Sequence, residues 1–192
     1  MTDATSPALI LASASPRRAE LLKQIGVSHR IVPAEIDETP AAGEAIEDCV
    51  QRLARSKALQ VQRRFPSLHV LGADTVVVVD ELMFGKARDR AEGLEMLRRL
   101  SGRSHQVLSA VALASGQKLH QGLSRSVVRF RSLSEQECAA YWDSGEPQDK
   151  AGAYAIQGRA ALFIEYLSGS YSGVMGLPLY ETGQLLRAAG IA

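Results

Sequence analysis

The sequence predicts an α/β fold built on a mixed β-sheet. Apolar strand-like runs alternate with helical patterns along the whole chain, and no long linker, low-complexity tract or internal repeat interrupts them. Two strand-like segments, at about 104–115 and 119–131, are joined only by a turn at Ser115–Gly116. Strands joined by so short a turn pair antiparallel, whereas strands separated by helices can pair in parallel. The sheet is therefore expected to combine both kinds of pairing.

The first half of the chain opens with a strand that leads directly into a helix. Ser15 suits the N-cap of that helix, Pro16 suits its first position and Gly26 suits its end. Periodicity then predicts the remaining elements of this half. The five elements are a strand at about 8–12, a helix at 16–25, a short strand at 29–33, a long helix at about 44–63 and a buried strand at 69–79.

The second half contains two helices with capping signals. Asp89 with Glu92 forms a capping-box pattern at the start of one helix, and Ser134 with Glu137 forms the same pattern at the start of another. The other expected features are a hairpin turn near Asp80–Glu81, helix ends at Ser101–Gly102 and about Ser144, short strands within about 153–167 and a last helix from about Pro178 to Ala189.

Length and composition exclude several classes of protein. The 192 residues suit a single domain spanning 1–192, and 46% hydrophobic residues suffice for a core. A net charge of +1 argues against a nonspecific nucleic-acid binder, and no apolar run reaches the length of a membrane span. Met1 to Pro7 does not resemble a signal peptide. Cys49 and Cys138 lie far apart and are expected to be buried free thiols, which indicates a reducing, cytoplasmic location.

The segment from Ser13 to Arg18 is the most informative stretch of the chain. It places Ser13, Ser15, Arg17 and Arg18 at a helix N-terminus, where free backbone N–H groups and a partial positive charge attract anions. One interpretation is therefore a site for a ligand with several phosphates. The other is an ordinary strand–turn–helix connection with arginines at the surface.

Acidic residues mark a second candidate region. Asp74 lies within the most hydrophobic strand, where an unpaired carboxylate is costly to bury. It either faces a cleft, as a metal ligand or a base, or sits at a strand kink permitted by Gly72 and hydrogen-bonds to a loop. Glu38 ends the acidic group that begins at Glu35, which is either a solvated loop or, together with Asp74, a source of the oxygen ligands that Mg²⁺ prefers.

Two lysines are candidates for contacts with an anion. Lys57 follows Leu53 by four residues and precedes Val61 by four, so it shares the apolar face of its helix. It either extends along its stem to water or meets a buried anion. Lys86 follows the expected hairpin and, considered alone, is a surface lysine.

Gln157 lies in a glycine-rich stretch, 149–158, and is expected to be buried. Its amide carries both a donor and an acceptor, as the edge of a nucleobase requires. The alternative is that the amide caps the backbone of its own loop.

Taken together, these features resemble the Maf family of nucleoside triphosphate pyrophosphatases, from about Leu9 to Leu186. Each motif is weak alone, but eight follow one another in family order. They are Ser-x-Ser-Pro-Arg-Arg at 13–18, the helix of Lys57, Gly-Ala-Asp-Thr at 72–75, Gly-Lys at 85–86, Leu-Ser-Gly at 100–102, Ser-Gly-Glu-Pro at 144–147, the stretch 149–158 and Gly-Leu-Pro at 176–178.

The resemblance implies an elongated fold, similar to inosine triphosphatase, in which a mixed sheet flanked by helices forms two lobes around a central cleft. It implies cleavage of a nucleoside triphosphate to the monophosphate and pyrophosphate with Mg²⁺ or Mn²⁺, in a homodimer. Asp74 would be the catalytic base and Glu38 a second essential acid, both near the metal. The triphosphate would be bound by Ser13, Arg18, Lys57 and Lys86. The two lysines would also be catalytic residues.

Within the family, Arg17, Thr75 and Gln157 match the subgroup that acts on dTTP and UTP, whereas the subgroup acting on 7-methyl-GTP has Trp, Gln and Glu near these places. The resemblance implies a housecleaning role in which modified uridine triphosphates are hydrolysed as well. One departure is Ala87, where the family usually has proline. It predicts a change in loop stiffness with activity retained. Two alternatives stay open: a purine or modified-nucleotide specificity, and a nucleotide-binding regulator of septum formation and cell division without turnover.

Overall fold

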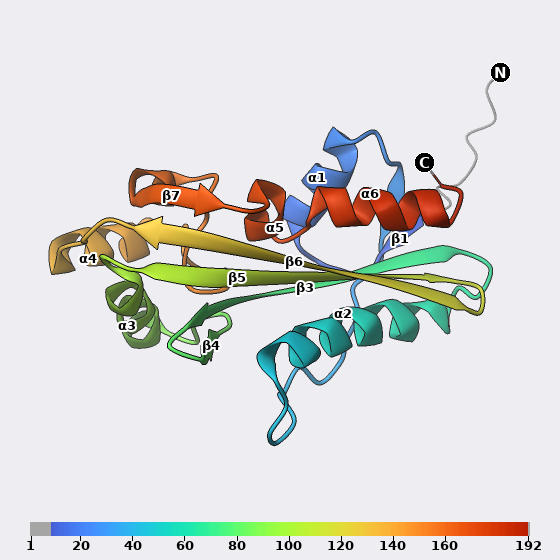
Figure 1. Ribbon diagram of the computed structural model, residues 1–192, viewed down its shortest axis with the longest axis horizontal. Coiled ribbons are helices and arrows are strands. Elements are labelled where there is room, and N and C mark those ends of the chain that lie inside the picture. The colour runs from blue at the N-terminus through green and yellow to red at the C-terminus, as the bar shows by residue number, and fades with distance from the viewer. Residues whose placement is uncertain (1–8, 192) are drawn as a thin grey trace. The chain divides into compact units, whose positions relative to one another are not determined.

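A computed structural model describes residues 9–191 (Figure 1). Met1 to Pro7 and the first position of the expected strand at 8–12 lie outside the described residues. The strands are β1 (Leu9–Leu11), β2 (His29–Ile31), β3 (His69–Val79), β4 (Leu82–Phe84), β5 (Ser104–Ser115), β6 (Lys118–Phe130) and β7 (Ile164–Ser168). The helices are α1 (Pro16–Gln24), α2 (Ile46–Gln62), α3 (Arg90–Leu100), α4 (Glu135–Asp143), α5 (Tyr171–Met175) and α6 (Leu179–Ala188), with a 3₁₀ turn η1 (Arg159–Leu162).

The strands form one seven-stranded mixed sheet, which confirms the predicted fold class. Its order is β2-β1-β3-β5-β6-β7, and β4 pairs with β3 off this path. β1 pairs in parallel with both β2 and β3, whereas β3 with β4 and β6 with β7 pair antiparallel. Parallel neighbours require crossover connections, and α1 and α2 supply them.

The chain divides into two compact units. Of the described residues, unit 1 contains 9–74, 109–123 and 176–191, and unit 2 contains 75–108 and 124–175. Within unit 1, α2 covers one face of the sheet while α1 and α6 cover the other (Figure 1). Its core includes Ile10, Val61 and Val70. The expectation that 1–192 is a single domain, and that of a central cleft, stay predictions.

Unit 2 has an aromatic core in which α3 packs closely on α4. Phe130 and Tyr154 lie edge to face, with ring centroids 4.9 Å apart. A Cβ added at Gly93 would come within 1.9 Å of Trp142, so glycine is required where the two helices approach each other. These close contacts make α3 and α4 one packed layer against the strands of this unit.

Most capping signals form as the sequence predicts. Ser134 accepts a hydrogen bond from the N–H of Glu137, and the Glu137 carboxylate accepts one from the N–H of Ser134. At α3 the predicted capping box is wrong in one half. Asp89 accepts from the N–H of Glu92, but the Glu92 carboxylate binds the backbone and side chain of Arg88 instead.

The short strands predicted within 153–167 are wrong over their first part. Residues 153–156 are all buried and therefore imitate a buried strand, but Gly152 and Ala153 have φ angles of +66° and +56°, which break extended backbone. Turns and η1 occupy this stretch, and only β7 is a strand. The five-residue helix α5 was not predicted either, although Ser170 caps its start by accepting a hydrogen bond from the N–H of Gly173 at 2.9 Å.

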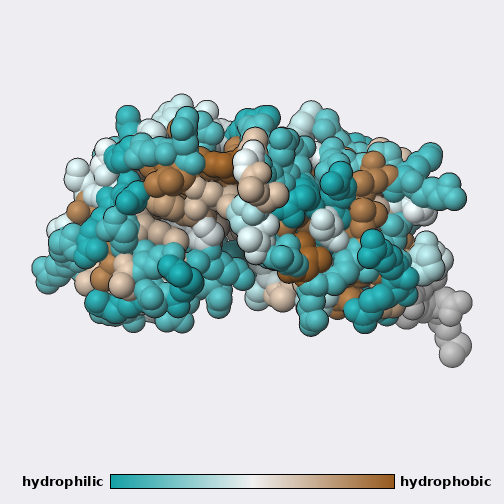
Figure 2. All heavy atoms as spheres, turned by 90° about the horizontal axis from the view of Figure 1, so that it is seen from below, coloured by the Kyte–Doolittle hydropathy of each residue, from teal (hydrophilic) through white to brown (hydrophobic). Residues whose placement is uncertain are grey.

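Figure 2 shows a face on which hydrophilic residues dominate and hydrophobic residues gather in separate patches. Both cysteines are buried free thiols, as predicted. Among the helices in the described range, none is long and apolar enough to cross a bilayer.

Candidate active site

A buried ion pair between α2 and β3 is the centre of the candidate site. Lys57 and Asp74 are 8% and 6% exposed, and Lys57 Nζ lies 2.7 Å from Asp74 Oδ1. The same nitrogen lies 2.7 Å from Glu38 Oε1, whose side chain is 59% exposed. Both carboxylates therefore converge on one ammonium group. This excludes the alternatives that Lys57 extends to water and that Asp74 is held only by a loop.

A glycine allows this pair to form. A Cβ added at Gly72 would lie 2.2 Å from the carbonyl oxygen of Ala54 and 2.7 Å from the backbone nitrogen of Ala58. The backbone of α2 therefore packs directly against β3 at the turn of helix that carries Lys57. This contact places the Lys57 side chain within reach of Asp74, two residues along the strand from Gly72.

Burial controls the electrostatics of Asp74. It raises the pKa of the Asp74 carboxyl, and the positive charges of Lys57 and then Arg18 oppose that rise. A carboxylate with a raised pKa accepts a proton more readily than an exposed aspartate does. The position therefore suits a general base whose charge is offset by two neighbouring cations.

Ser13 and Arg18 lie beside this pair, in the same unit. Arg18 Nη1 donates to Ser13 Oγ at 3.1 Å and to the carbonyl oxygen of Ala73 at 2.9 Å, and Arg18 Nε donates to the carbonyl oxygen of Gly176 at 2.8 Å. The guanidinium thus connects the turn before α1, strand β3 and the segment that enters α6. Burial lowers the pKa of Arg18, and the nearby Asp74 carboxylate opposes that change.

The start of α1 matches the sequence prediction in position. Ser15 is the N-cap and Pro16 begins the helix, although the Ser15 side chain makes no capping hydrogen bond. The hydroxyl of Ser13 instead accepts from the N–H of Ser15 at 3.2 Å. Arg17 is half-buried on the first turn of α1. The role of these residues in binding phosphates stays a prediction.

The other three predicted site residues belong to unit 2. Thr75 is half-buried and follows Asp74 on β3. Lys86 is exposed and pairs with Ala151 in an isolated antiparallel bridge, which fixes the start of the Gln157 loop. The expectation that Gln157 is buried is wrong: its side chain is exposed. It hydrogen-bonds to no described residue, so it does not cap its own loop.

The donor set fits a hard divalent cation. Asp74 and Glu38 both place a carboxylate oxygen beside Lys57 Nζ. Among residues 9–191, no group of three or more His, Cys, Asp or Glu side chains lies together as a complete set of metal ligands. Mg²⁺ commonly takes one or two protein carboxylates and completes its coordination with water and substrate phosphates. These two residues would therefore hold Mg²⁺ or Mn²⁺ only as part of such a shared coordination sphere.

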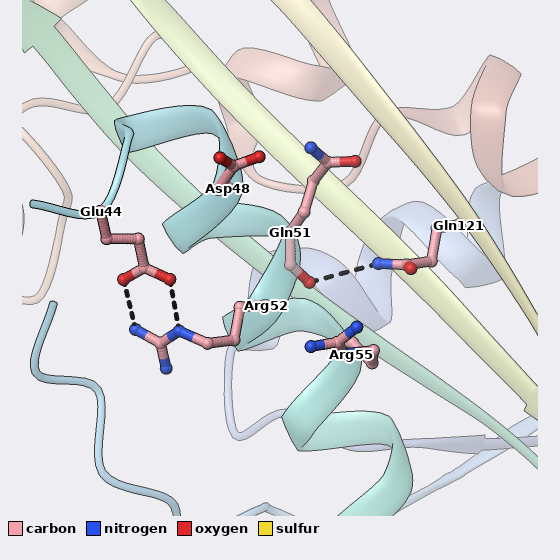
Figure 3. Close-up of a pocket in the computed structure, with 6 residues that line it drawn as sticks. All are labelled: Glu44, Asp48, Gln51, Arg52, Arg55 and Gln121. Atoms are coloured by element: carbon pink, nitrogen blue, oxygen red, sulfur yellow. Dashed lines mark hydrogen bonds and ion pairs between the residues drawn. The ribbon is translucent and has the colours of Figure 1, made fainter. Parts of the chain in front are cut away.

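A polar hollow on another face of α2 was not predicted. Figure 3 shows its lining, in which Arg52 forms a two-pronged ion pair with Glu44, with Nε–Oε1 and Nη2–Oε2 distances of 2.6 and 2.8 Å. Arg55 also lines it but is two residues from Lys57, so the two side chains point to different sides of the helix. The hollow is therefore separate from the Lys57 centre.

Comparison with known proteins assigns the chain to a family. Residues 8–189 match the family Maf, described as Maf-like protein. The chain belongs to the Maf family. A Maf relative from Methylococcus capsulatus, named dTTP/UTP pyrophosphatase, is 55% identical over 95% of this chain and 91% of its own length. Relatives of the same name from Bordetella parapertussis (51% identical, 100% and 99% covered) and Aromatoleum aromaticum (49% identical, 95% of each covered) are also similar.

Proposed function

We propose that this Maf protein hydrolyses dTTP and UTP to the monophosphate and pyrophosphate, and so removes unwanted pyrimidine triphosphates. Family membership and about 50% identity to relatives named dTTP/UTP pyrophosphatase over nearly the whole chain support the reaction. The observation that carries the proposal is the buried Asp74 carboxylate. Its pKa is raised, and it forms an ion pair with Lys57. The residue before it, Ala73, accepts a hydrogen bond from Arg18 through its carbonyl oxygen.

In the proposed reaction, Asp74 takes a proton from a water molecule whose oxygen forms a new bond to phosphorus, while the P–O–P link between the α- and β-phosphates breaks and pyrophosphate leaves. Lys57 holds the Asp74 carboxylate in place, and its positive charge also attracts the phosphates. Ser13 and Arg18, at the start of α1, bind and orient the triphosphate, and the positive end of the α1 dipole favours its negative charge. Asp74 and Glu38 would hold Mg²⁺ or Mn²⁺, which would supply Lewis acidity and offset phosphate charge.

The base is selected in this proposal by Gln157, with Thr75 and Arg17. An amide presents a donor and an acceptor, which complement the acceptor and donor of a uracil or thymine edge. The exposed Gln157 amide is available for such contacts because it binds no described residue. Lys86 is exposed and pairs with Ala151 where the same loop begins. It contributes a further positive charge that stabilises the departing pyrophosphate.

Pyrophosphate release from a panel of nucleoside triphosphates with Mg²⁺ tests the function. We expect release from dTTP and UTP by the wild-type protein and a loss of at least about a hundredfold in Asp74→Asn, since general-base catalysis contributes about that much. Asp48→Asn, an exposed aspartate on α2, is the matched control and should leave the rate unchanged. Equal rates in Asp74→Asn and the wild type would contradict the role of Asp74. Bound nucleotide without pyrophosphate release would favour a nucleotide-binding regulator.

The cytoplasmic location and the homodimer belong to the same proposal and are supported by the resemblance to the family. Light scattering coupled to size-exclusion chromatography would show a mass of about 41 kDa for the dimer, twice the 20.7 kDa of the chain. A mass of one chain at micromolar concentration would contradict it.

A further inference from the structure

One carboxylate holds the backbone around Gln157. The Oε2 atom of Glu146 accepts the N–H of Arg159 at 2.9 Å, and its Oε1 atom accepts the N–H of Ala160 at 3.4 Å. Oε1 also accepts the hydroxyl of Tyr141 at 2.8 Å. The Tyr141 oxygen in turn accepts the N–H of Ala155 at 3.1 Å. Backbone groups on both sides of Gln157 are therefore tied to a single Glu–Tyr pair.

This pair is well suited to a fixed geometry. Tyr141 is 4% exposed and extends from α4, whose position is set by its packing against α3. Burial opposes ionisation of Glu146, but hydrogen bonds from Arg159 and Tyr141 outweigh it and lower the pKa of Glu146. Glu146 is therefore an ionised acceptor at neutral pH, and hydrogen bonds to charged acceptors are stronger than neutral ones.

The loop fits closely around the carboxylate. A Cβ added at Gly158 would come within 2.4 Å of both Glu146 oxygens, so no side chain is tolerated between Gln157 and Arg159. On the other side of the loop, Tyr154 is anchored by a 2.9 Å hydrogen bond between its hydroxyl and His105 Nε2. The backbone is thus immobilised before and after Gln157.

The Gln157 side chain contrasts with this fixed backbone. It is exposed and makes no hydrogen bond with any described residue. The backbone that carries this amide is therefore already ordered, and only the Gln157 side chain has still to be ordered when a ligand binds.

We propose that Glu146, acting through Tyr141 and the backbone of 155–160, is a positioning residue for base selection, holding the Gln157 amide where it meets the edge of a uracil or thymine base. This inference rests on the proposed function, which supplies Gln157 as the base-reading group. It adds two residues, Glu146 and Tyr141, that touch no substrate themselves and that act only by fixing the backbone from which the Gln157 side chain extends.

Glu146→Gln is the sharpest variant. The amide keeps the size of the side chain but replaces one acceptor oxygen by a donor that faces an N–H or hydroxyl donor. Glu146→Asp keeps two acceptor oxygens and should recover part of the effect. Tyr141→Phe removes only the hydroxyl and leaves the Ala155 N–H without its partner. Glu135→Gln, an exposed residue of α4, is the control.

The readout is selectivity between UTP and CTP, whose bases have similar size but exchange donor and acceptor at positions 3 and 4. We expect Glu146→Gln to lower kcat/KM for UTP about tenfold or more, chiefly through KM, and to lower the UTP:CTP ratio by a similar factor. In a Gln157→Ala background, Glu146→Gln should change that ratio no further, because the two act in series. A uniform fall for both nucleotides, an unchanged ratio, or additive effects in the double variant would overturn the inference.

Failure of the proposed function is distinguishable from failure of this inference. If the wild-type protein released no pyrophosphate, calorimetry would measure the affinities of the same variants for UTP and CTP, and the ratio of these affinities would replace the ratio of kcat/KM. Equal loss of affinity for both nucleotides would then overturn the inference. Thermal unfolding of each variant identifies one that fails to fold, and Tyr141→Phe then replaces Glu146→Gln in the double-variant comparison.

Discussion

Arg18 links three segments that are distant in the sequence. Its guanidinium donates to Ser13 Oγ, to the Ala73 carbonyl oxygen and to the Gly176 carbonyl oxygen. A lysine keeps the charge but has a single nitrogen, so it cannot reach all three acceptors with the planar geometry of arginine. We expect Arg18→Lys to lower the free energy of unfolding by about 1–3 kcal/mol, because acceptors with reduced access to water lose their partners.

Urea denaturation measures this loss, and Arg63→Lys at the exposed end of α2 is the matched control. The control should change the unfolding free energy by less than about 0.5 kcal/mol. Equal stability of Arg18→Lys and the wild type would show that the three hydrogen bonds add nothing to the folded state.

Sequence could mark both members of the charged pair but not the pair itself. Asp74 and Lys57 each interrupt an apolar pattern, which indicates that each needs a partner if it is buried. Only the structure shows that they are partners of each other. The partners of Arg18 are backbone carbonyls, which have no signature in the amino-acid sequence. For Gln157 the error has a clear cause: its neighbours 152–156 are buried, and burial of a loop does not fix the direction of the next side chain.

At the scale of elements, the contact between α2 and β3 controls the site. Gly72→Ala would force its methyl group against the backbone of Ala54 and Ala58, and neither backbone atom can move independently of the helix. We expect the helix to shift outward, at a cost of about 1–3 kcal/mol in unfolding free energy, and Lys57 to move away from Asp74. Pyrophosphate release should therefore fall by more than the loss of folded protein explains.

Gly183→Ala provides the opposite control. Gly183 lies within α6, and an added Cβ would meet only the tip of the Arg187 side chain at 3.6 Å. Alanine favours a helix over glycine by up to about 1 kcal/mol, so this variant should be more stable with unchanged activity. If Gly72→Ala kept full activity at 25 °C, the contact with α2 would not be what positions Lys57.

The elements that sequence predicted well are the long ones. β3, β5, β6 and α2 each have eleven or more residues, enough for a period to be visible. α5 has five residues, too few for a period to be visible, and was not predicted. The three-residue strands β1, β2 and β4 were expected nonetheless, β4 through the hairpin turn at Asp80–Glu81, and β4 pairs antiparallel with β3. The stretch 153–163 was mistaken because burial in a packed turn and burial in a strand look alike without the backbone angles.

For the whole molecule, charge is balanced overall and concentrated locally. A net charge of +1 gives no general attraction for polyanions. At the site, however, the cations Lys57, Arg18 and Arg17 lie together with the carboxylates of Asp74 and Glu38. Such focusing suits a small charged ligand. Salt should therefore weaken binding of a triphosphate at this site while the protein shows no affinity for long nucleic acids.

The stability of the folded protein toward acid should depend on His105. This residue is 3% exposed in the aromatic core of unit 2, and burial lowers its pKa from 6.5 to about 4. The unfolded chain binds a proton at this histidine below about pH 6.5, while the folded chain does not until about pH 4. Stability is therefore retained above pH 6.5 and lost as the pH falls toward 4, by about 3 kcal/mol from this group.

Chemical denaturation between pH 7 and pH 4 tests this, with the change in unfolding free energy across the range as the readout. His105→Gln can still hydrogen-bond to Tyr154 but does not titrate, so its stability should fall by about 3 kcal/mol less than that of the wild type over the same range. His29→Gln, at a half-buried position in β2, is the control and should keep the wild-type dependence. The same fall in His105→Gln and the wild type would mean that acid unfolds the protein through groups other than His105.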